Sequence, residues 1–308
     1  MTYKKKAALL LILILCLIIS YAVTFLCDPE VKYKNSNLVW LENRYVSLAD
    51  RIEIYGIAGK TVLIKKNNVW VISDGPAQYP AKQTRVEELF RDLSRRKNYP
   101  LRSSASEYER FGVGDGANRI VIMGGAGLPL LDLLIGYADA SGKELFLRKQ
   151  GSKEIRSGED IFTIYTDSDK QFWYDLRIFA GLQAASVQKI HLFPAGAPES
   201  LALTGSLTLC RRNNQWVNEI TGSVVVGAES WLRSILDIQG QDFINTIDFN
   251  TEERIVMELG DGSTCVLRIG PPDASGDRAA AITGSGFSYI LSEWTMRRIW
   301  DFYKLGIY

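Results

Sequence analysis

The sequence is poor in histidine and cysteine and has no excess of charge of either sign. Its 308 residues include one histidine and four cysteines, too few for a zinc site built from several histidines. The 36 basic and 35 acidic residues nearly cancel, whereas nucleic-acid-binding proteins normally carry a clear basic excess. We therefore expect no metal site, no cofactor and no nucleic-acid partner.

Catalytic motifs are also missing. No Gly-x-Ser-x-Gly elbow is present to supply a nucleophile to His191, and a lone histidine without such partners is usually structural. The glycine-rich stretches lack the Lys-Ser/Thr ending of a phosphate loop. Because 46% of the residues are hydrophobic and 23% are charged, the chain can still build folded cores. We predict a folded protein that is not an enzyme and has no catalytic residues.

A long apolar run lies at the N-terminus. Ala7–Leu26 holds 20 residues without a formal charge, and as a helix it would span about 30 Å, the thickness of a bilayer's hydrocarbon core. Three lysines, Lys4 to Lys6, precede the run, and Asp28 follows it. Lysines mark the cytoplasmic side of a membrane helix. We therefore predict that residues 1–28 are a cytoplasmic tail and a single transmembrane anchor, that Ala7–Leu26 contacts the lipid bilayer, and that the bulk of the chain is extracytoplasmic (periplasmic).

Two alternatives to a retained anchor stay open. Cleavage of a signal peptide could follow Ser20-Tyr21-Ala22, although the apolar run continues beyond that site. Lipidation at Cys27 would need a small preceding residue, and Leu26 stands there. With the three lysines removed and no acidic residue before Asp28, the remainder has 33 basic and 35 acidic residues. That portion is not a polybasic surface that would bind anionic lipid.

The rest of the chain contains an internal repeat. The segment KKNNVWV at Lys65–Val71 corresponds to RRNNQWV at Arg211–Val217, an offset of 146 residues. Three shorter matches follow in the same order, Arg119-Ile120-Val121 with Arg254-Ile255-Val256, Ile135-Gly136 with Ile269-Gly270, and Tyr174-Asp175-Leu176 with Trp300-Asp301-Phe302, at offsets of 135, 134 and 126. The falling offset indicates that the second copy has lost loop residues.

Each copy shows the same pattern of predicted elements. A β-hairpin with Asn-Asn at its turn comes first, and asparagine tolerates the positive φ of a tight turn. An amphipathic helix follows (Thr84–Arg95 and Ala228–Ile238), then antiparallel strands, then a short closing helix. The last strand of the first copy is predicted at Asp160–Tyr165. The order of elements indicates an α+β fold with two homologous lobes, each an antiparallel sheet with one amphipathic helix and a short closing helix.

Lobe boundaries follow from the repeat. Residues 29–60 are predicted to form a juxtamembrane stalk that either contains one strand at Asn43–Ser47 or packs on the first lobe. The first lobe spans 61–180, a linker with the opening strand of the second lobe spans 181–199, and the second lobe spans 200–308.

Four residues of the two lobes are of particular interest. Trp70 and Trp216 occupy strands that should face a helix, so we expect them to fill the two repeat cores. Cys210 and Cys265 stand where the first copy has Ile64 and Leu131. They are either small buried residues or a disulfide between adjacent strands, which an oxidising envelope would permit.

The first copy resembles a known family. The N-terminal apolar segment, the x-Trp-Val strand, the helix, Tyr108–Val113 (YERFGV) and Phe172–Arg177 (FWYDLR) are similar to the DUF-4340 family, a domain of unknown function. The family often has a proline after its Phe/Tyr-Gly-Leu turn, and Gly114-Asp115-Gly116 stands there instead. The resemblance implies a membrane-anchored extracytoplasmic protein that accompanies an ABC-type transport system of the gliding-motility type, and it implies no catalytic residues.

Two functional hypotheses follow. The first is a non-enzymatic, membrane-tethered scaffold or accessory subunit of a transport or envelope complex, with an ABC-type permease or its auxiliary subunit as partner. The second is an envelope module that binds polysaccharide or peptidoglycan, because 21 of the 33 aromatic residues are Tyr or Trp. Exposure of Trp70 and Trp216 in an aromatic cleft would favour the second hypothesis.

Overall fold

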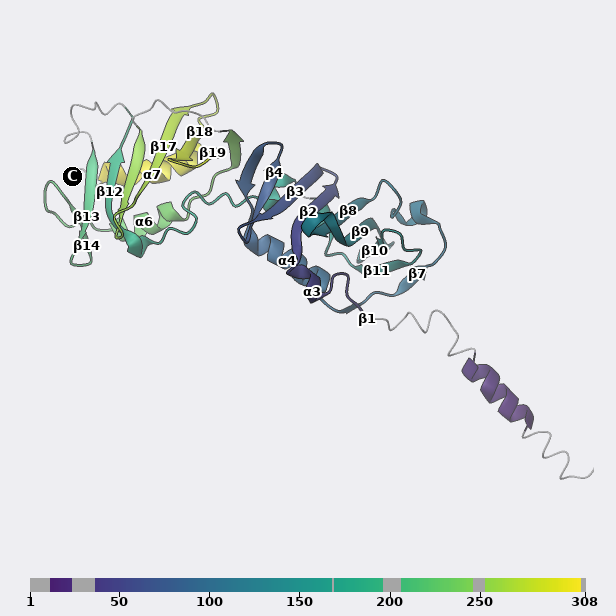
Figure 1. Ribbon diagram of the computed structural model, residues 1–308. Helices are drawn as coiled ribbons and strands as arrows, with labels where there is room; N and C mark the ends of the chain where they lie inside the picture. The colour runs from purple at the N-terminus through teal and green to yellow at the C-terminus, as the bar shows by residue number, and fades with distance from the viewer. Residues whose placement is uncertain (1–11, 24–36, 168, 196–205, 246–252, 306–308) are drawn as a thin grey trace, which may run out of the picture. The chain divides into compact units, whose positions relative to one another are not determined.

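The computed structural model describes residues 12–23, 37–167, 169–195, 206–245 and 253–305. The chain divides into two compact units, Met1–Tyr174 and Asp175–Tyr308. Each unit is built on one large antiparallel sheet with helices beside it (Figure 1). The α+β class predicted from the sequence is therefore confirmed. The sequence puts the end of the first lobe at residue 180, whereas the units divide after Tyr174.

Nine strands form the large sheet of the first unit, in the order β5-β4-β3-β2-β8-β9-β10-β11-β7. Neighbouring strands are antiparallel throughout. The strands are β2 (Ala49–Gly56), β3 (Gly59–Lys66), β4 (Val69–Asp74), β5 (Ala77–Pro80), β7 (Leu101–Ser103), β8 (Asn118–Gly124), β9 (Leu128–Ala138), β10 (Glu144–Lys149) and β11 (Ile155–Glu159). The helices are α3 (Asn43–Val46), α4 (Gln83–Ser94) and α5 (Thr163–Thr166), with short 3-10 turns η1 (Tyr108–Phe111), η2 (Gly125–Gly127) and η3 (Lys170–Trp173).

Eight strands form the sheet of the second unit, in the order β14-β13-β12-β16-β17-β18-β19-β15. They are β12 (Val187–Phe193), β13 (Leu207–Arg212), β14 (Gln215–Asn218), β15 (Asp242–Asn245), β16 (Arg254–Leu259), β17 (Thr264–Pro272), β18 (Arg278–Ile282) and β19 (Phe287–Leu291). Two α-helices, α6 (Ala228–Leu236) and α7 (Glu293–Leu305), and the 3-10 turn η4 (Ala184–Ser186) complete the described part of this unit.

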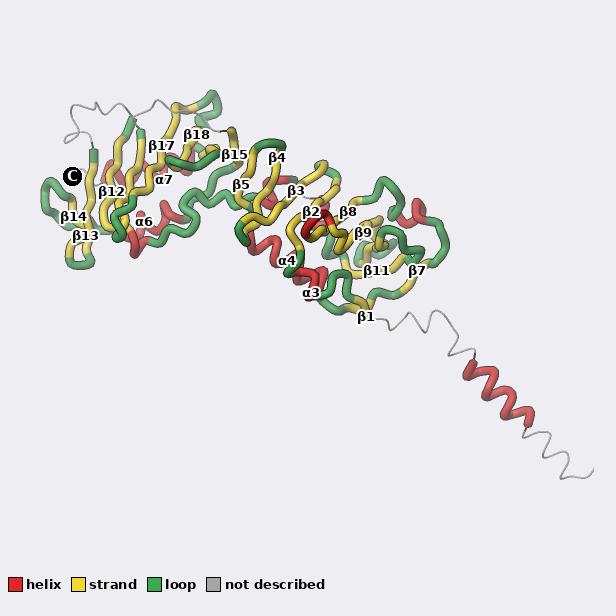
Figure 2. The backbone as a smooth tube through the Cα atoms, viewed as in Figure 1, coloured by secondary structure: helices red, strands yellow, loops and turns green. Residues whose placement is uncertain are grey.

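Apart from the edge strand β5, the two sheets have the same strand order. In each unit the first strand of the large sheet that comes after the amphipathic helix, β7 or β15, does not pair with the strand nearest to it in sequence. It pairs instead with the last strand of the sheet, β11 or β19, and so forms the far edge. The strands of each sheet can be followed in yellow in Figure 2. This long-range pairing is a topological feature that the two units share.

The residue pairing agrees as well. In the first sheet Arg51 lies opposite Ile64, and in the second Lys189 lies opposite Cys210. Ile64 and Cys210 are related by the same offset of 146 as the two Asn-Asn turns. The sequence matches therefore coincide with matching positions in the two sheets.

The hairpin turns have the predicted backbone. Asn67 and Asn68 have φ values of 49° and 64°, and Asn213 and Asn214 have values of 52° and 61°. Positive φ at both central residues is typical of the type I′ turn, whose twist matches that of the flanking strands. The prediction of two tight Asn-Asn hairpins is confirmed.

An amphipathic helix packs on the inner face of each sheet. In α4 the buried residues Val86, Leu89, Phe90 and Leu93 recur at helical spacing, and in α6 the buried residues are Ala228, Trp231, Leu232, Ile235 and Leu236. In the first unit Ile52, Ile54, Leu63 and Ile120 are buried on strands β2, β3 and β8. Removal of these side chains from water is the main favourable term in folding of the unit.

Of the two alternatives for residues 29–60, the strand at Asn43–Ser47 is wrong, and packing on the first lobe agrees with the structure from Asn37 onward. Asn43–Val46 is the short helix α3, not a strand. The strand comes later, at Ala49–Gly56, and lies in the middle of the sheet between β3 and β8. Upstream of α3, β1 (Asn37–Leu38) pairs with β6 (Lys97–Asn98), and Trp40 is buried against Tyr99 with ring centroids 5.1 Å apart. From Asn37 onward this stretch is part of the first unit, because Trp40, Ile52 and Ile54 supply core side chains.

A second correction concerns the end of the first unit. The strand predicted at Asp160–Tyr165 is a turn followed by α5, and the strand β11 ends at Glu159. Phe162 and Tyr165 are buried all the same. Phe162 and Tyr165 are apolar or aromatic because they are buried at the single helical turn α5, not because they belong to a strand.

The N-terminal segment is described only in part. Residues 12–23 of the predicted anchor are helical, and the other residues of Ala7–Leu26 lie outside the described residues. Within the described part of the chain, no helix has both the length and the apolar character needed to cross a membrane.

Candidate functional site

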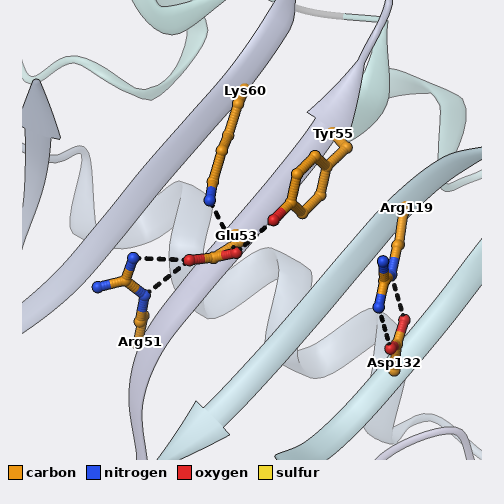
Figure 3. Close-up of polar contacts among 6 residues, drawn as sticks. All are labelled: Arg51, Glu53, Tyr55, Lys60, Arg119 and Asp132. Carbon is orange, nitrogen blue, oxygen red and sulfur yellow. Dashed lines mark hydrogen bonds and ion pairs between the residues drawn. The ribbon is translucent and has the colours of Figure 1, made fainter. Parts of the chain in front are cut away.

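The outer face of the first sheet carries a buried carboxylate, Glu53 on β2, at the centre of a polar cluster (Figure 3). Its side chain accepts hydrogen bonds from Arg51 Nε at 2.8 Å and Nη2 at 2.6 Å, and from the Tyr55 hydroxyl at 2.5 Å. Arg51 binds Oε1, whereas Tyr55 binds Oε2, and Lys60 Nζ on β3 also lies 3.0 Å from Oε2. Glu53 is only 6% exposed, so these contacts replace the water that burial removes.

The charge state of Glu53 follows from this cluster. Burial raises the pKa of the carboxyl, but the hydrogen bonds from Tyr55, Lys60 and Arg51 outweigh burial and lower the pKa to about 2. The group is therefore a fixed anion at neutral pH. A carboxylate that acts as a general acid or base needs a pKa near the working pH, so Glu53 is better suited to holding its neighbours in place.

A second ion pair lies beside this cluster. Arg119 Nε on β8 donates to Asp132 Oδ1 on β9 at 2.6 Å, and Nη2 donates to Asp132 Oδ2. Tyr55 lies directly opposite both Lys60 and Arg119 in the sheet. The Lys60 ammonium is 4.9 Å and the Arg119 guanidinium 5.8 Å from the centre of the Tyr55 ring, within the range of a cation–π contact. The result is a rigid row of cation, ring and cation across three strands.

The second sheet carries a related row at the matching positions. His191 on β12 lies opposite Thr208 and Val256, as Glu53 lies opposite Val62 and Val121. Phe193 takes the place of Tyr55, and Arg254 takes the place of Arg119. The Arg254 guanidinium lies 4.1 Å from the centre of the Phe193 ring. The arginine–aromatic contact is thus present in both units, while the central carboxylate is replaced by histidine.

His191 is hydrogen-bonded at both ring nitrogens. Nδ1 lies 3.1 Å from the Thr208 hydroxyl and Nε2 lies 2.9 Å from Glu258 Oε1. A hydroxyl, an imidazole and a carboxylate in a chain are also the parts of a hydrolytic triad. Here the hydroxyl belongs to Thr208 in β13, which pairs with β12 on one side and β14 on the other. The backbone around Thr208 is therefore hydrogen-bonded within the sheet and does not form an oxyanion hole. The contacts favour a structural histidine.

Trp70 and Trp216, the predicted core residues, are 7% and 4% exposed. Gln83 at the start of α4 accepts a hydrogen bond from Trp70 N and donates one to Trp70 O, both at 2.9 Å. In the second unit Glu229 accepts a hydrogen bond from Trp216 Nε1 at 3.0 Å. Gln83 and Glu229 are 146 residues apart, the offset of the Asn-Asn turns, so in both units a polar residue in the first turn of the helix is hydrogen-bonded to the tryptophan of the neighbouring strand.

Cys210 and Cys265, considered above as a disulfide, are both free. Cys210 lies on β13 and Cys265 on β17, with β12 and β16 between them. Strands in a sheet are about 4.8 Å apart, so three steps separate the two cysteines by about 14 Å, far beyond the Cα–Cα distance that a disulfide spans. Both side chains are half-buried, and burial raises the pKa of the Cys265 thiol.

The polar row around Glu53 is the feature that the sequence reading misses. A signal for it exists in Arg51–Tyr55, where charged or polar residues alternate with Ile52 and Ile54 in the period of a strand. Within the described residues, no group of three His, Cys, Asp or Glu side chains is placed to hold a metal ion. Comparison of the chain with protein-family models, curated proteins and solved structures gives no match.

Proposed function

We propose that this protein is a non-enzymatic, membrane-tethered extracytoplasmic subunit that serves as a scaffold or accessory component of an ABC-type transport or envelope complex. The observation that carries the proposal is the pair of sheets with equal strand order and matching arginine–aromatic rows on their outer faces. Two related and rigid faces on one chain suit the simultaneous binding of partner surfaces. Rigid interface groups lower the entropic cost of association.

Other features support the same role. The lysines before Ala7–Leu26 favour an anchor with the two units outside the cytoplasm, and the DUF-4340 resemblance of Tyr108–Val113 and Phe172–Arg177 points to a transport-associated protein. A strand order that is shared apart from β5, and four sequence matches that keep their order along the chain, support an origin of the two units by duplication. The low pKa of Glu53 and the pairing of the backbone around Thr208 within the sheet are better explained by a structural role of these residues than by a catalytic one.

The test is co-purification of the tagged full-length chain from native membranes in a mild non-ionic detergent, followed by mass spectrometry. We expect an ABC-type permease or its auxiliary subunit in stoichiometric amount. Arg268→Glu reverses an exposed charge on β17, directly opposite Arg254, and should reduce recovery of that partner. Glu87→Lys, which reverses an exposed charge on α4, is the matched control and should not. Recovery of the chain alone would contradict the proposal.

A second candidate function is a ligand-binding module for polysaccharide or peptidoglycan. Trp70 and Trp216 are buried and cannot stack on a sugar, so these two residues do not support a polysaccharide-binding function. A different observation favours it, a pocket of about 480 Å³ in the second unit that is lined by Trp300, Arg278 and Glu253 among others. Saturable binding of peptidoglycan fragments to the full-length chain, lost in Trp300→Ala, would favour this function. Absence of such binding would exclude it.

A further inference from the structure

A pocket of about 600 Å³ that is open on one side lies in the first unit, and its lining includes no residue of the Glu53 cluster. Its walls come from the glycine-rich segment after η1, the C-terminal end of β9, and the residues from Asp160 to Asp167 around α5. The volume is in the range of pockets that hold small organic ligands. A bare metal ion would leave most of such a space unfilled.

Glycines make room for the aromatic wall of this pocket. Gly112 has a φ of 67°, and a Cβ added there would lie 2.8 Å from the Tyr137 ring. A Cβ on Gly136 would lie 2.1 Å from the backbone oxygen of Phe111. These contacts explain why residues without side chains are needed at both positions. Tyr137 itself is 64% exposed, so its ring remains available to a ligand.

The pocket is charged with one sign only. Glu109, Asp160 and Asp167 line it, and the lining includes no Lys, Arg or His. Among the described residues, none of these three carboxylates forms an ion pair with a basic side chain. Asp160 and Asp167 accept hydrogen bonds from neutral groups: the Thr163 hydroxyl donates to Asp160, and Asp167 accepts from Asn118 at 3.4 Å and from the Thr166 hydroxyl at 3.5 Å. All three residues are exposed, and the pocket is open to solvent on one side. In a chain with 36 basic and 35 acidic residues, a pocket whose charged lining residues are all acidic favours a cation.

The pocket lies at a connection that is longer in the first copy of the repeat than in the second. Residues 104–117 connect β7 to β8 in the first unit, whereas only residues 246–253 connect the corresponding β15 and β16. The longer connection contains Glu109 and the glycine-rich segment. The sequence offset falls from 146 to 135 across the same region. Both units form the same sheet although this connection differs in length, so the longer connection is not required for the sheet, which favours a separate role.

We propose that this pocket binds an organic cation, a primary ammonium or guanidinium group on a short apolar stem. The three carboxylates would accept its N–H donors, and the Tyr137 ring would lie against its charged or apolar part. The group could be carried by a free polyamine or by a basic side chain of a polypeptide. The inference does not depend on the membrane anchor or on an ABC-type partner.

The experiment is isothermal titration of the full-length chain in non-ionic detergent. The probes are Nα-acetyl-arginine amide, its neutral isostere Nα-acetyl-citrulline amide, and spermidine. We expect saturable binding of at least one cation, no binding of the citrulline compound, and weaker binding as salt concentration rises. Tighter binding of spermidine would identify a free polyamine as the source, and tighter binding of the arginine compound would identify a polypeptide side chain.

Single substitutions in the lining test whether the cation binds in this pocket. Asp160→Asn and Asp167→Asn should each weaken binding about tenfold, the loss expected for one charge-assisted hydrogen bond. Gly116→Leu should also weaken it, because a Cβ at Gly116 meets no atom within 4 Å and the larger side chain can occupy the space without strain. Glu87→Gln removes an equal charge from the exposed face of α4 and should leave binding unchanged.

Two results would overturn the inference. One is the lack of saturable binding for both cations. The other is binding that Asp160→Asn, Asp167→Asn and Gly116→Leu all leave within twofold of the parent chain, since the ligand would then occupy another place. Circular dichroism of each variant separates loss of binding from loss of folding.

Discussion

Arg119 and Arg254 occupy the same position in two different sheets, each directly opposite an aromatic residue of the neighbouring strand. The partners are Tyr55 in the first unit and Phe193 in the second. The 135 residues that separate the two arginines are the offset of the surrounding Arg-Ile-Val matches. The relationship shows that the sequence repeat and the sheet register describe the same correspondence, and it provides matched sites for experiments in the two units.

The first prediction concerns acid stability. The pKa of Glu53 is about 2 in the folded chain, below its ordinary value of 4.5. Its stabilising effect is therefore present in full above about pH 5 and is lost as pH falls from about 4.5 towards 2, an effect of roughly 3 kcal/mol at most. Hydrogen exchange of peptides from β2 and β3 should report this loss of protection.

Glu53→Gln tests the origin of that effect. The variant should be less stable than the parent by about 1–3 kcal/mol at neutral pH and should show a much smaller change between about pH 5 and 3. Glu293→Gln, at an exposed pair with Arg297, should differ from the parent by less than about 0.5 kcal/mol. An equal pH response in Glu53→Gln and the parent would contradict the role assigned to Glu53.

The second prediction concerns the polar tie between helix and strand. Gln83→Ala would leave the backbone N–H and C=O of Trp70 without the side-chain contacts that they have now, at a cost of about 1–3 kcal/mol. The loss should appear in hydrogen exchange of β4 and α4, and exchange of β14 should stay unchanged. Thr84→Ala, one residue further along the same helix, is the control.

The third prediction concerns the two hairpin turns. Glycine adopts positive φ more readily than asparagine, so Asn68→Gly and Asn214→Gly should keep or raise stability by up to about 1 kcal/mol. Asn68→Val and Asn214→Val should lower it by about 1–2 kcal/mol, because a β-branched residue is strained at positive φ. Urea midpoints of the four variants provide the comparison. Equal midpoints for the Gly and Val variants would contradict a positive φ at Asn68 and Asn214.

The fourth prediction concerns the cysteines. Since β12 and β16 separate Cys210 from Cys265, the purified chain should contain both as free thiols. Unfolding without reductant, followed by alkylation and peptide mass spectrometry, should show both residues fully modified. A crosslinked Cys210–Cys265 peptide would show that the register of the second sheet is different.

Local features of the sequence allowed correct predictions of local structure. The Asn-Asn turns depend on two adjacent residues, and the burial of Val86, Leu89 and Leu93 in α4 depends on spacing within one helix. The apolar pattern of the sequence does not predict the strand β2, because Arg51 and Glu53 interrupt that pattern. Their charges are acceptable inside a sheet only because Tyr55 and Lys60 complete the hydrogen bonds, and a sequence pattern does not reveal that pairing.

The sequence by itself determined the internal repeat, from short matches that keep their order along the chain. It also determined the hairpins, the main helices and the antiparallel α+β character, because these follow from composition or spacing within short segments. Only the tertiary structure decided that β7 joins β11 and that β15 joins β19, since those pairings depend on which edges remain free after the other strands have assembled. It also decided the pocket, where Glu109, Tyr137 and Asp160 meet from three separate segments. Packing of side chains distant in sequence, and not local preference, determines both.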